Sequence, residues 1–258
     1  MTTSTLRALY HASSKHSGYQ LLADSVAPLL PDVTPPRSRH ERERLAYLLR
    51  HVDVRGAHVI DVGGNTGFFS IALLDAGAAR VTHVEGNAAH HAFVREAAHV
   101  LGYGDRLDTR HEYASFTRGA LPRAHGMLLL NVLHHLGDDF GSASLSREAA
   151  KARMLAPLRT LAHEYHWLAF QLGFNWKGDR HEPLFATGTK AELIEFVRSE
   201  TSTDWTIDAI GIAERRADGL VFADLDEANI ARNDALGEFL NRPLFILRSR
   251  HVAAGAIG

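Results

Sequence analysis

Apolar residues in the middle of the chain come in short continuous runs, and the stretches between the runs have helical periodicity. Short apolar runs bounded by turn residues are typical of buried strands, whereas apolar residues three and four positions apart are typical of one-sided helices. The runs predict five strands, at residues 58–62, 81–85, 107–111, 127–132 and 167–172. The periodic stretches predict helices at residues 68–76, 88–101 and 146–162.

This alternation of strand and helix predicts parallel strands joined by right-handed crossovers, which is a doubly wound, Rossmann-like α/β fold. A further helix is predicted at residues 189–198, with Thr189 as its N-cap and Glu192 at the capping-box position. Two more strands, at residues 207–213 and 244–248, are expected to form an antiparallel pair at one edge. The prediction is therefore a mostly parallel sheet of seven strands.

The first 50 residues have helical spacing and no strand pattern. Two helical stretches are predicted, separated by residues 31–36, where consecutive prolines cannot continue a helix. We expect residues 1–50 to form an N-terminal helical lid and residues 51–258 to form the main α/β domain. The N-terminal helices and the insertion at residues 217–241 are candidate dimer or lid surfaces.

Composition removes several classes of function. The 258 residues include 28 Lys plus Arg against 30 Asp plus Glu, so the excess of basic charge expected of a general nucleic-acid binder is missing. The sequence has no cysteine, which excludes disulfides and thiolate metal ligands. No apolar run approaches the ~20 residues that span a bilayer, and no secretory signal is recognised, so we expect a cytoplasmic protein. Arginine greatly outnumbers lysine, as in proteins from GC-rich bacterial genomes.

The most informative stretch is residues 59–70, which read VIDVGGNTGFFS. A strand enters a glycine-rich turn and a helix leaves it, so Gly63 and Gly67 permit a tight turn with a ligand against the backbone. Glu85 lies 18 residues beyond Gly67, at the end of the second predicted strand, where an acid can accept hydrogen bonds from ribose hydroxyls. The spacing is not the G-x-G-x-x-G of dinucleotide sites, which argues against NAD or FAD.

With these residues, the sequence resembles the class I S-adenosylmethionine-dependent methyltransferases, whose first motif is an acid followed by G-x-G-x-G. Asn65 replaces the middle glycine, and asparagine tolerates left-handed backbone angles. The resemblance covers roughly residues 55–175 and implies that S-adenosylmethionine is the cofactor. It implies that the glycine loop approaches the methionine part and that Glu85 holds the ribose; the implied loop residues are Asp61, Gly63, Gly64, Asn65 and Gly67.

The resemblance also implies further cofactor contacts. A polar residue just after the third strand would read the adenine amino group, with Glu112 and Tyr113 as candidates. Lys15 and Tyr19 lie in the N-terminal region that often folds over the cofactor in related methyltransferases, and helical spacing would place both on one face. An exposed loop at residues 112–113 and an ordinary surface helix at residues 15–19 are the alternatives.

Residues for an acceptor molecule are expected after the fourth and fifth strands, because ligands of this fold bind at the carboxyl ends of the strands. The fourth strand leads into Asn-Val-Leu-His-His-Leu, which is similar to the fourth motif of many small-molecule methyltransferases. Asn131 would contact the cofactor amine or the acceptor, and His134 or His135 would take a proton from the acceptor. Positioning alone can also suffice for methyl transfer, without any base.

The loop after the fifth strand mixes amides, an aromatic ring and both signs of charge, which suits a polar small molecule. Gln171, Asn175 and Trp176 are the candidate acceptor contacts there. A histidine base favours a hydroxyl acceptor, whereas the acids Asp179 and Glu182 would suit a cationic amine, so oxygen and nitrogen remain open. No metal site is expected, because adjacent histidines point in different directions and no H-E-x-x-H motif occurs.

The function predicted from the sequence is methylation of an oxygen or nitrogen of a polar small molecule, such as a sugar, aminocyclitol, amino acid or natural-product intermediate. Nucleic-acid methylation is an alternative that the charge balance disfavours, and the Asn/Asp-Pro-Pro-aromatic motif of base-flipping enzymes is absent. A scaffold that keeps the fold without catalysis is a third alternative. A NAD-dependent oxidoreductase is the least favoured.

Overall fold

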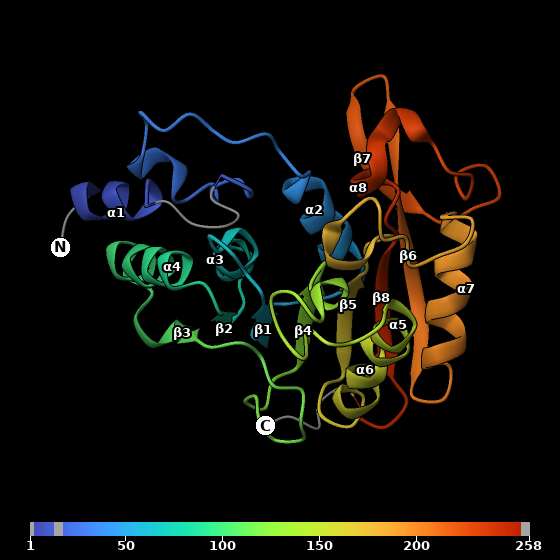
Figure 1. Cartoon of the computed structure of the whole chain (residues 1–258). Helices are drawn as coiled ribbons and strands as arrows, with labels where there is room; N and C mark the ends of the chain where they lie inside the picture. Colours follow the sequence, from blue (N-terminus) through green and yellow to red (C-terminus); the bar gives the residue numbers. More distant parts are fainter. Residues whose placement is uncertain (1–2, 13–17, 254–258) are drawn as a thin grey trace. The chain divides into compact units, whose positions relative to one another are not determined.

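The computed structural model describes residues 3–12 and 18–253, and these contain eight strands and eight α-helices (Figure 1). By their internal packing the residues divide into two compact units, 1–114 and 115–258, and each is described by itself. The α/β class predicted from the sequence is confirmed. Within the described ranges, every helix is too short or too polar to cross a membrane.

In the first unit, three parallel strands lie side by side in the order β3-β2-β1. Each predicted strand and helix of this region is present, with small changes at the ends, which confirms the alternating pattern. The helix after each strand packs back on the strands, α3 on β1 and β2 and α4 on β2 and β3 (Figure 1). The elements are β1 (His58–Val62), α3 (Phe68–Asp75), β2 (Arg80–Glu85), α4 (Ala88–Val100), η2 (Gly104–Arg106) and β3 (Leu107–His111).

The N-terminal part of this unit is less helical than its apolar spacing predicts. Helix α1 (Thr3–Tyr10) packs against α4, with the rings of Tyr10 and Phe93 5.5 Å apart. Helix α2 (Glu41–His51) confirms the second predicted helix. The expected helix around residues 19–26 is wrong: apart from the short turn η1 (Ala27–Leu29), the backbone there is irregular, and its apolar side chains are buried without helical structure. The lid function of residues 1–50 stays a prediction.

The second unit contains five strands, of which β4 and β5 are parallel and the rest are antiparallel to their neighbours. Their order is β4-β5-β8-β6-β7, so β8 lies between β5 and β6. Strand β5 is buried along its whole length and forms the centre of the core. The strands are β4 (Gly126–Leu130), β5 (Trp167–Gln171), β6 (Trp205–Arg216), β7 (Gly219–Asp224) and β8 (Leu244–Ser249).

The expected total of seven strands is wrong, because β7 lies within the stretch that was predicted to be an insertion. Strands β6 and β7 form a hairpin through residues 217–218, and Gly219 opens β7 at φ 138°. The loop is thus Ala217 and Asp218, and the glycine with positive φ comes directly after it. Strands β6 and β8 are antiparallel as expected, but β8 is an inner strand rather than an edge strand.

The long helix predicted at residues 146–162 is two helices, α5 (Arg147–Met154) and α6 (Ala156–Leu161), because the chain bends at Leu155 before a proline in the first turn of α6. Thr189 caps α7 (Lys190–Thr201) as expected, and its hydroxyl accepts from the Glu192 N–H at 3.2 Å. The remaining short helices are η3 (Leu133–His135), η4 (Trp176–Gly178), η5 (Asp234–Leu236) and α8 (Gly237–Leu240).

Candidate functional site

The glycine loop between β1 and α3 has the backbone conformation that its sequence suggests. Gly63, Asn65 and Gly67 have φ values of 66°, 52° and 80°, all in the left-handed region. Asparagine adopts this region more readily than most residues, so the tight turn survives without the middle glycine. The Asn65 side chain accepts from the next backbone N–H, that of Thr66, at 2.8 Å. The loop is therefore a compact turn that ends at the N-terminus of α3.

Below the loop, three buried polar side chains form a hydrogen-bonded cluster. The Ser70 hydroxyl donates to Asp61 at 2.7 Å and lies 2.9 Å from Nδ1 of His83. Burial raises the pKa of Asp61 to about 6 and lowers the pKa of His83 to about 3. A Cβ on Gly64 would lie only 2.5 Å from Nδ1 of His83, so the loop lies directly on this cluster.

Glu85 ends β2 and ties the loop to the start of the next helix. One carboxylate oxygen accepts from the Asn65 backbone N–H at 2.8 Å, and the other accepts from the Asn87 N–H at 2.7 Å. A carboxylate accepts hydrogen bonds only, which is the chemistry that the hydroxyls of a ribose require of a partner. Glu85 therefore has a structural role in the loop that is compatible with the predicted ribose contact.

Beside Glu85, the ring of Tyr113 lies on Gly86. A Cβ on Gly86 would come within 2.5 Å of this ring, so only glycine allows the contact. Tyr113 is 62% exposed, which leaves much of the aromatic ring accessible next to Glu85. Glu112 is also exposed and pairs weakly with Arg110 at 3.8 Å. Of the two candidates for the adenine contact, Tyr113 is thus the one that adjoins Glu85.

The N-terminal segment contributes a residue that the sequence analysis did not single out. The side-chain oxygen of buried Gln20 accepts from the Phe68 backbone N–H at 3.0 Å and from the Thr66 hydroxyl at 3.4 Å. Gln20 thus caps the first turn of α3. Its neighbour Tyr19 lies outside any helix and packs under the Arg39 guanidinium, 4.0 Å from the ring centre. Lys15 lies outside the described residues, and its predicted contact with the cofactor stays a prediction.

In the second unit, the two adjacent histidines after β4 have different surroundings. His134 is buried, and its Nδ1 accepts from the Gly173 N–H at 3.2 Å, which puts the ring proton on Nε2. Burial, then the charge of Arg242, holds the pKa of His134 well below its usual range. His135 is partly exposed, with Nδ1 3.2 Å from Asp139 and 3.9 Å from Asp138.

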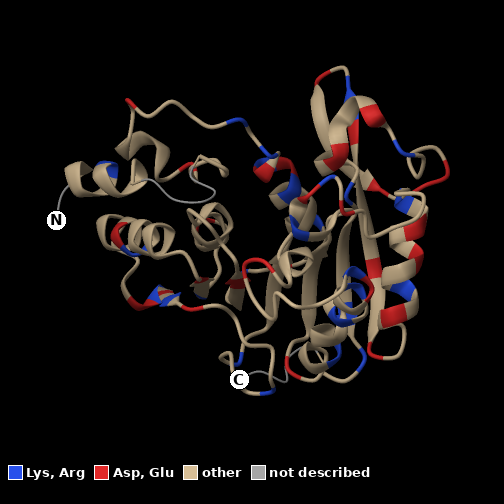
Figure 2. Ribbon diagram, in the orientation of Figure 1, with Lys and Arg blue, Asp and Glu red and all other residues tan. Residues whose placement is uncertain are grey.

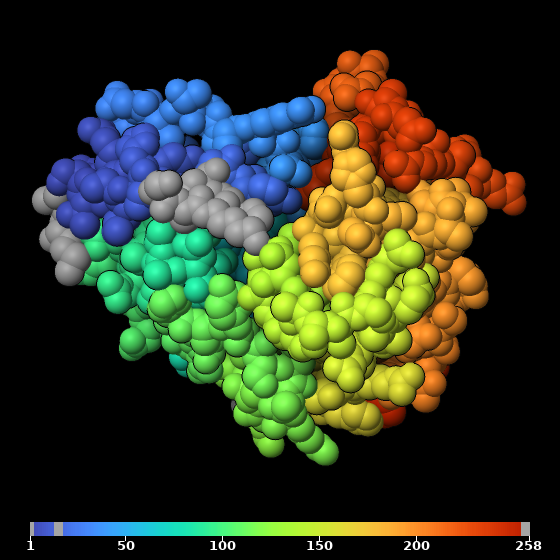
Figure 3. All heavy atoms as spheres, viewed as in Figure 1, coloured from blue at the N-terminus to red at the C-terminus, as the bar shows by residue number. Residues whose placement is uncertain are grey.

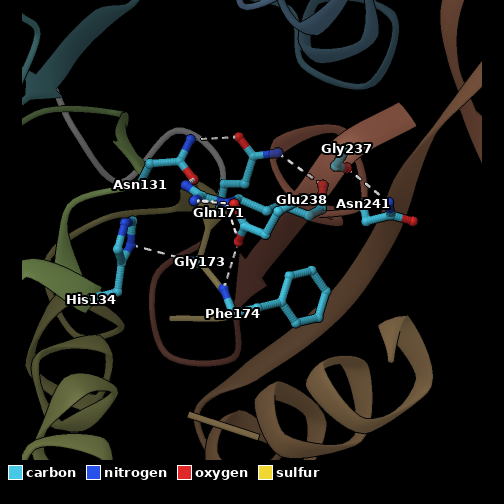
Figure 4. A network of polar contacts seen from close by, with 9 residues as sticks. Asn131, His134, Gln171, Gly173, Phe174, Gly237, Glu238 and Asn241 are labelled. Carbon is cyan, nitrogen blue, oxygen red and sulfur yellow. Dashed lines mark hydrogen bonds and ion pairs between the residues drawn. The ribbon is translucent and has the colours of Figure 1, made fainter. Parts of the chain in front are cut away.

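Asn131 and Gln171, both predicted to contact ligands, belong to a network around buried Arg242 (Figure 4). The Asn131 amide donates to Gln171 at 2.9 Å, and the Gln171 amide donates to the Arg242 carbonyl at 2.9 Å. The Arg242 guanidinium donates to Asn131 at 2.8 Å and binds both oxygens of Glu238 at 3.0 and 2.6 Å. Glu238 also accepts from the Phe174 N–H at 3.1 Å.

This network fixes the ends of β4 and β5. Asn131 has φ 62°, which ends β4 at Leu130, two residues before the predicted end. Its side chain is held by Gln171 and Arg242, so both predicted ligand residues have firm partners within the protein. Arg242 and Glu238 were missed because they lie in a polar stretch more than 100 residues beyond Asn131, with no local motif. Sequence spacing gives no signal for such a contact.

The loop after β5 packs against the loop after β4. Trp176 is buried, and its indole N–H donates to the Leu136 carbonyl at 2.6 Å. Asn175 forms an isolated β-bridge with Pro183 in the same loop. Residues 130–150 and 175–190 both reach the face of the second unit seen in the space-filling view (Figure 3). Trp176 therefore joins the two loops, and its predicted contact with an acceptor stays a prediction.

Comparison with known proteins identifies the fold. The sequence matches no family model and no curated protein. Among solved structures, the bifunctional kinase-methyltransferase WbdD matches with a TM-score of 0.52 at 15% identity, over 96% of this chain and 47% of that chain. A complex of WbdD with a kinase inhibitor gives 0.58 at 14% identity, over 94% and 47%. The chain spans about half the length of WbdD.

A candidate RNA methyltransferase from Pyrococcus horikoshii also matches, with a TM-score of 0.49 at 13% identity over 95% of this chain and 96% of that chain. Likeness at such low identity shows the fold alone. The two WbdD matches, both with TM-scores above 0.5, show that the chain shares its fold with part of a kinase-methyltransferase, in agreement with the fold that the glycine-loop motif predicted.

Proposed function

We propose that the chain is an S-adenosylmethionine-dependent methyltransferase that acts on a polar small molecule. The observation that carries the proposal is the glycine loop, with Asn65 in the left-handed region and its N–H bound by Glu85 at the end of β2. The methyltransferase fold of the matched structures supports the same reading. The residues fit the cofactor, because Glu85 places a hydrogen-bond acceptor beside the glycine loop and the accessible Tyr113 ring lies on Gly86.

In this proposal the first unit holds the cofactor. The backbone from Gly63 to Gly67 would lie against its methionine part, Glu85 would accept from the ribose hydroxyls and Tyr113 would pack on the adenine. When bound, S-adenosylmethionine supplies an electrophilic methyl group on a positively charged sulfur. The chain contributes by orienting the two reactants in line and excluding water from them, which is the main requirement of a direct displacement.

The proposed acceptor residues come from the segments after β4 and β5. His135 is the better candidate for the base, because its side chain is partly exposed where that of His134 is buried, and because the Asp139 carboxylate lies 3.2 Å from its Nδ1. His135 would accept the proton that the acceptor oxygen or nitrogen releases when it is methylated. His134 would instead orient the Gly173 backbone, since its low pKa keeps it neutral. Asn175 and Trp176 remain candidate acceptor contacts.

A polar small molecule is favoured over nucleic acid by the distribution of charge. Acidic and basic residues are mixed along α7 and the loops beside it (Figure 2). The net charge of −2 provides no excess of cations to bind a phosphate backbone. Both observations favour an acceptor recognised by a few polar contacts rather than by a long charged surface.

The first experiment is isothermal titration of the protein with S-adenosylmethionine and S-adenosylhomocysteine, with NAD as the control ligand. We expect saturable binding of the first two and none of NAD. Glu85→Gln should weaken binding by about 1.5 to 3 kcal/mol through loss of a charge-assisted bond, whereas Glu148→Gln on exposed α5 should not. If neither S-adenosylmethionine nor S-adenosylhomocysteine binds, the alternative of a scaffold that keeps the fold without catalysis is favoured.

A second experiment identifies the acceptor with a radiolabelled methyl group. Sugars, aminocyclitols and amino acids are screened with the parent protein, and the best acceptor is then tested with His135→Ala and Asp139→Asn. Both variants should lower turnover more than cofactor affinity and should change the pH profile. A pH profile unchanged in His135→Ala would remove this histidine from proton transfer.

A further inference from the structure

Three metal-ligating side chains meet in the second unit, away from the residues of the proposed function. They are His163, Asp204 and His251, and their ligand atoms all lie within 4.8 Å of one another. Nε2 of His251 is 3.0 Å from Asp204 Oδ1, and Nε2 of His163 is 3.9 Å from the same oxygen. The two imidazole rings are stacked, with centres 4.0 Å apart. Two histidines and one carboxylate thus converge on one point.

The three side chains come from segments far apart in the sequence. His163 follows α6, Asp204 lies between α7 and β6, and His251 follows β8. Spacing along the chain therefore gives no metal motif, which is why the sequence analysis expected no metal site. The convergence is produced by the tertiary fold alone.

Hydrogen bonds that do not involve the three side chains hold these segments together. The Ser249 hydroxyl donates to the Ala162 carbonyl at 2.5 Å and accepts from the His251 N–H at 2.9 Å. The Arg250 N–H donates to the Asp204 carbonyl at 2.9 Å. The Trp205 indole N–H donates to the Leu158 carbonyl of α6 at 2.8 Å. The backbone segments that carry the three side chains are thus held together without an ion.

We propose that His163, Asp204 and His251 form a binding site for a divalent transition-metal ion, with zinc as the expected occupant. Imidazole and carboxylate are the ligands that such ions take, at about 2.0 to 2.2 Å for zinc. Three protein ligands leave one tetrahedral position for water. Solvent can reach the site, because the side chains of His163 and His251 are 47% and 33% exposed, while that of Asp204 is 13% exposed.

Binding would link the end of α6, the start of β6 and the segment after β8. An ion that binds the folded chain and not the unfolded chain raises the stability of the fold. The site would then act as a crosslink for the segment around His251, in a chain that has no cysteine to form a disulfide.

The described residues contain one other group of this kind, His135, Asp138 and Asp139. All three lie on one turn and belong to the proposed acceptor region, so this group crosslinks nothing. It provides the matched control, because His135→Ala removes a histidine from the competing group and leaves the proposed site intact.

The test is equilibrium dialysis of the tag-free, chelator-treated protein against zinc at pH 7.5, with the bound metal measured by atomic emission. The parent and His135→Ala should each bind one zinc ion at the proposed site. His163→Ala, His251→Ala and Asp204→Asn should lose affinity by more than roughly tenfold, since even groups outside the first ligand shell contribute 10- to 100-fold. Loss of binding in His135→Ala alone, or binding unchanged in the other three, would overturn the proposal.

Thermal unfolding provides the second readout. At a zinc concentration about 100 times the parent's Kd, we expect the Tm of the parent to rise by roughly 5 to 10 °C and that of His163→Ala to rise by at most about half as much. His251→Gln, which retains a polar side chain, covers the case in which an alanine variant fails to fold. A parent Tm that zinc does not raise would contradict a site specific to the folded state.

Discussion

At the residue scale, the side chains packed against Gly64 leave no room for a side chain at this position. Its Cα faces His83 and Asp61 so closely that a Cβ would sit 2.5 to 2.8 Å from their side-chain atoms. His83 is buried and bonded to Ser70, so it has no room to withdraw. The glycine at this position is required by packing, in addition to any contact with a ligand.

Gly64→Ala should therefore destabilise the protein by about 1 to 3 kcal/mol through overpacking, as measured by guanidinium unfolding. The control is Gly102→Ala, where no atom lies within 4 Å of the added methyl and only the backbone strain of a positive φ is introduced. Equal losses of stability in the two variants would mean that the contact with His83 does not cause the destabilisation of Gly64→Ala.

Asp61 gives a second prediction at this scale, through pH. Its pKa is about 6 in the folded protein against an ordinary 3.8, so the folded state holds more protons between these values. The stability that Asp61 contributes is present below pH 3.8 and is lost as the pH rises to about 6. Asp61→Asn cannot ionise, so its stability relative to the parent should increase by about 1 kcal/mol between pH 5 and pH 7.5.

The effect of His83 on stability has the opposite pH dependence. Because its pKa is lowered in the folded protein, the stability that it contributes is lost as the pH decreases. Both the parent and Asp61→Asn contain His83, so its effect cancels when their free energies of unfolding are subtracted. Asp105→Asn, at an exposed position, is the control variant. A difference between Asp61→Asn and the parent that is constant with pH would contradict the raised pKa.

At the element scale, local pattern predicted the strands and helices of residues 58–111 because each carries its own signal. The place of Asn65 in the turn and the place of Glu85 at the end of a strand were also predictable, because both lie in one strand-turn-helix-strand segment. The failures have physical causes. The segment at residues 19–26 buries its apolar side chains without a helix. Strand β7 has a run of only four apolar residues, Leu220 to Ala223, which is at the lower limit of a strand signal.

Long-range contacts set the limit of this kind of prediction. Gln20 caps a helix 48 residues away, and Arg242 bonds to Asn131 across 111 residues. Neither residue type nor local spacing specifies such partners, because they are selected by tertiary packing. The polar residues at the ends of β4 and β5, Asn131 and Gln171, form hydrogen bonds with Arg242, and their predicted contacts with a ligand stay predictions.

The Arg242 network allows a prediction about the elements that it joins. Arg242 is only 8% exposed and binds Glu238 through two bonds, so Arg242→Leu leaves a partly buried carboxylate without its cation. We expect a loss of about 3 to 5 kcal/mol in the free energy of unfolding. Arg242→Leu with Glu238→Leu should cost less than the sum of the two single variants.

The matched control is the exposed pair Arg198 and Glu195 on α7, whose N to O distance is 3.0 Å. The same double-mutant cycle there should give a coupling below about 1 kcal/mol, since water screens exposed pairs. Additive losses at Arg242 and Glu238 would show that each side chain contributes through packing rather than through their ion pair.

At the scale of the whole molecule, the predicted cofactor contacts that the structure describes lie mostly in the first unit. If the proposed function holds, hydrogen exchange with S-adenosylhomocysteine should slow the amides of residues 63–67 and 85–87. The hairpin of β6 and β7 should exchange at its original rate and serves as the internal control. Protection confined to β6 and β7 would place the ligand elsewhere and contradict the loop assignment.

The strand order of the second unit also has a consequence for how the protein is made. Strand β8 lies between β5 and β6, yet it follows both of them in the sequence. During synthesis, β5 and β6 therefore leave the ribosome before β8, the strand that pairs with both of them. Until β8 follows, the edge of each strand that faces β8 has no partner strand. Open edges of apolar strands are where newly synthesised chains associate wrongly. The interval before β8 appears is thus when this chain most needs a chaperone.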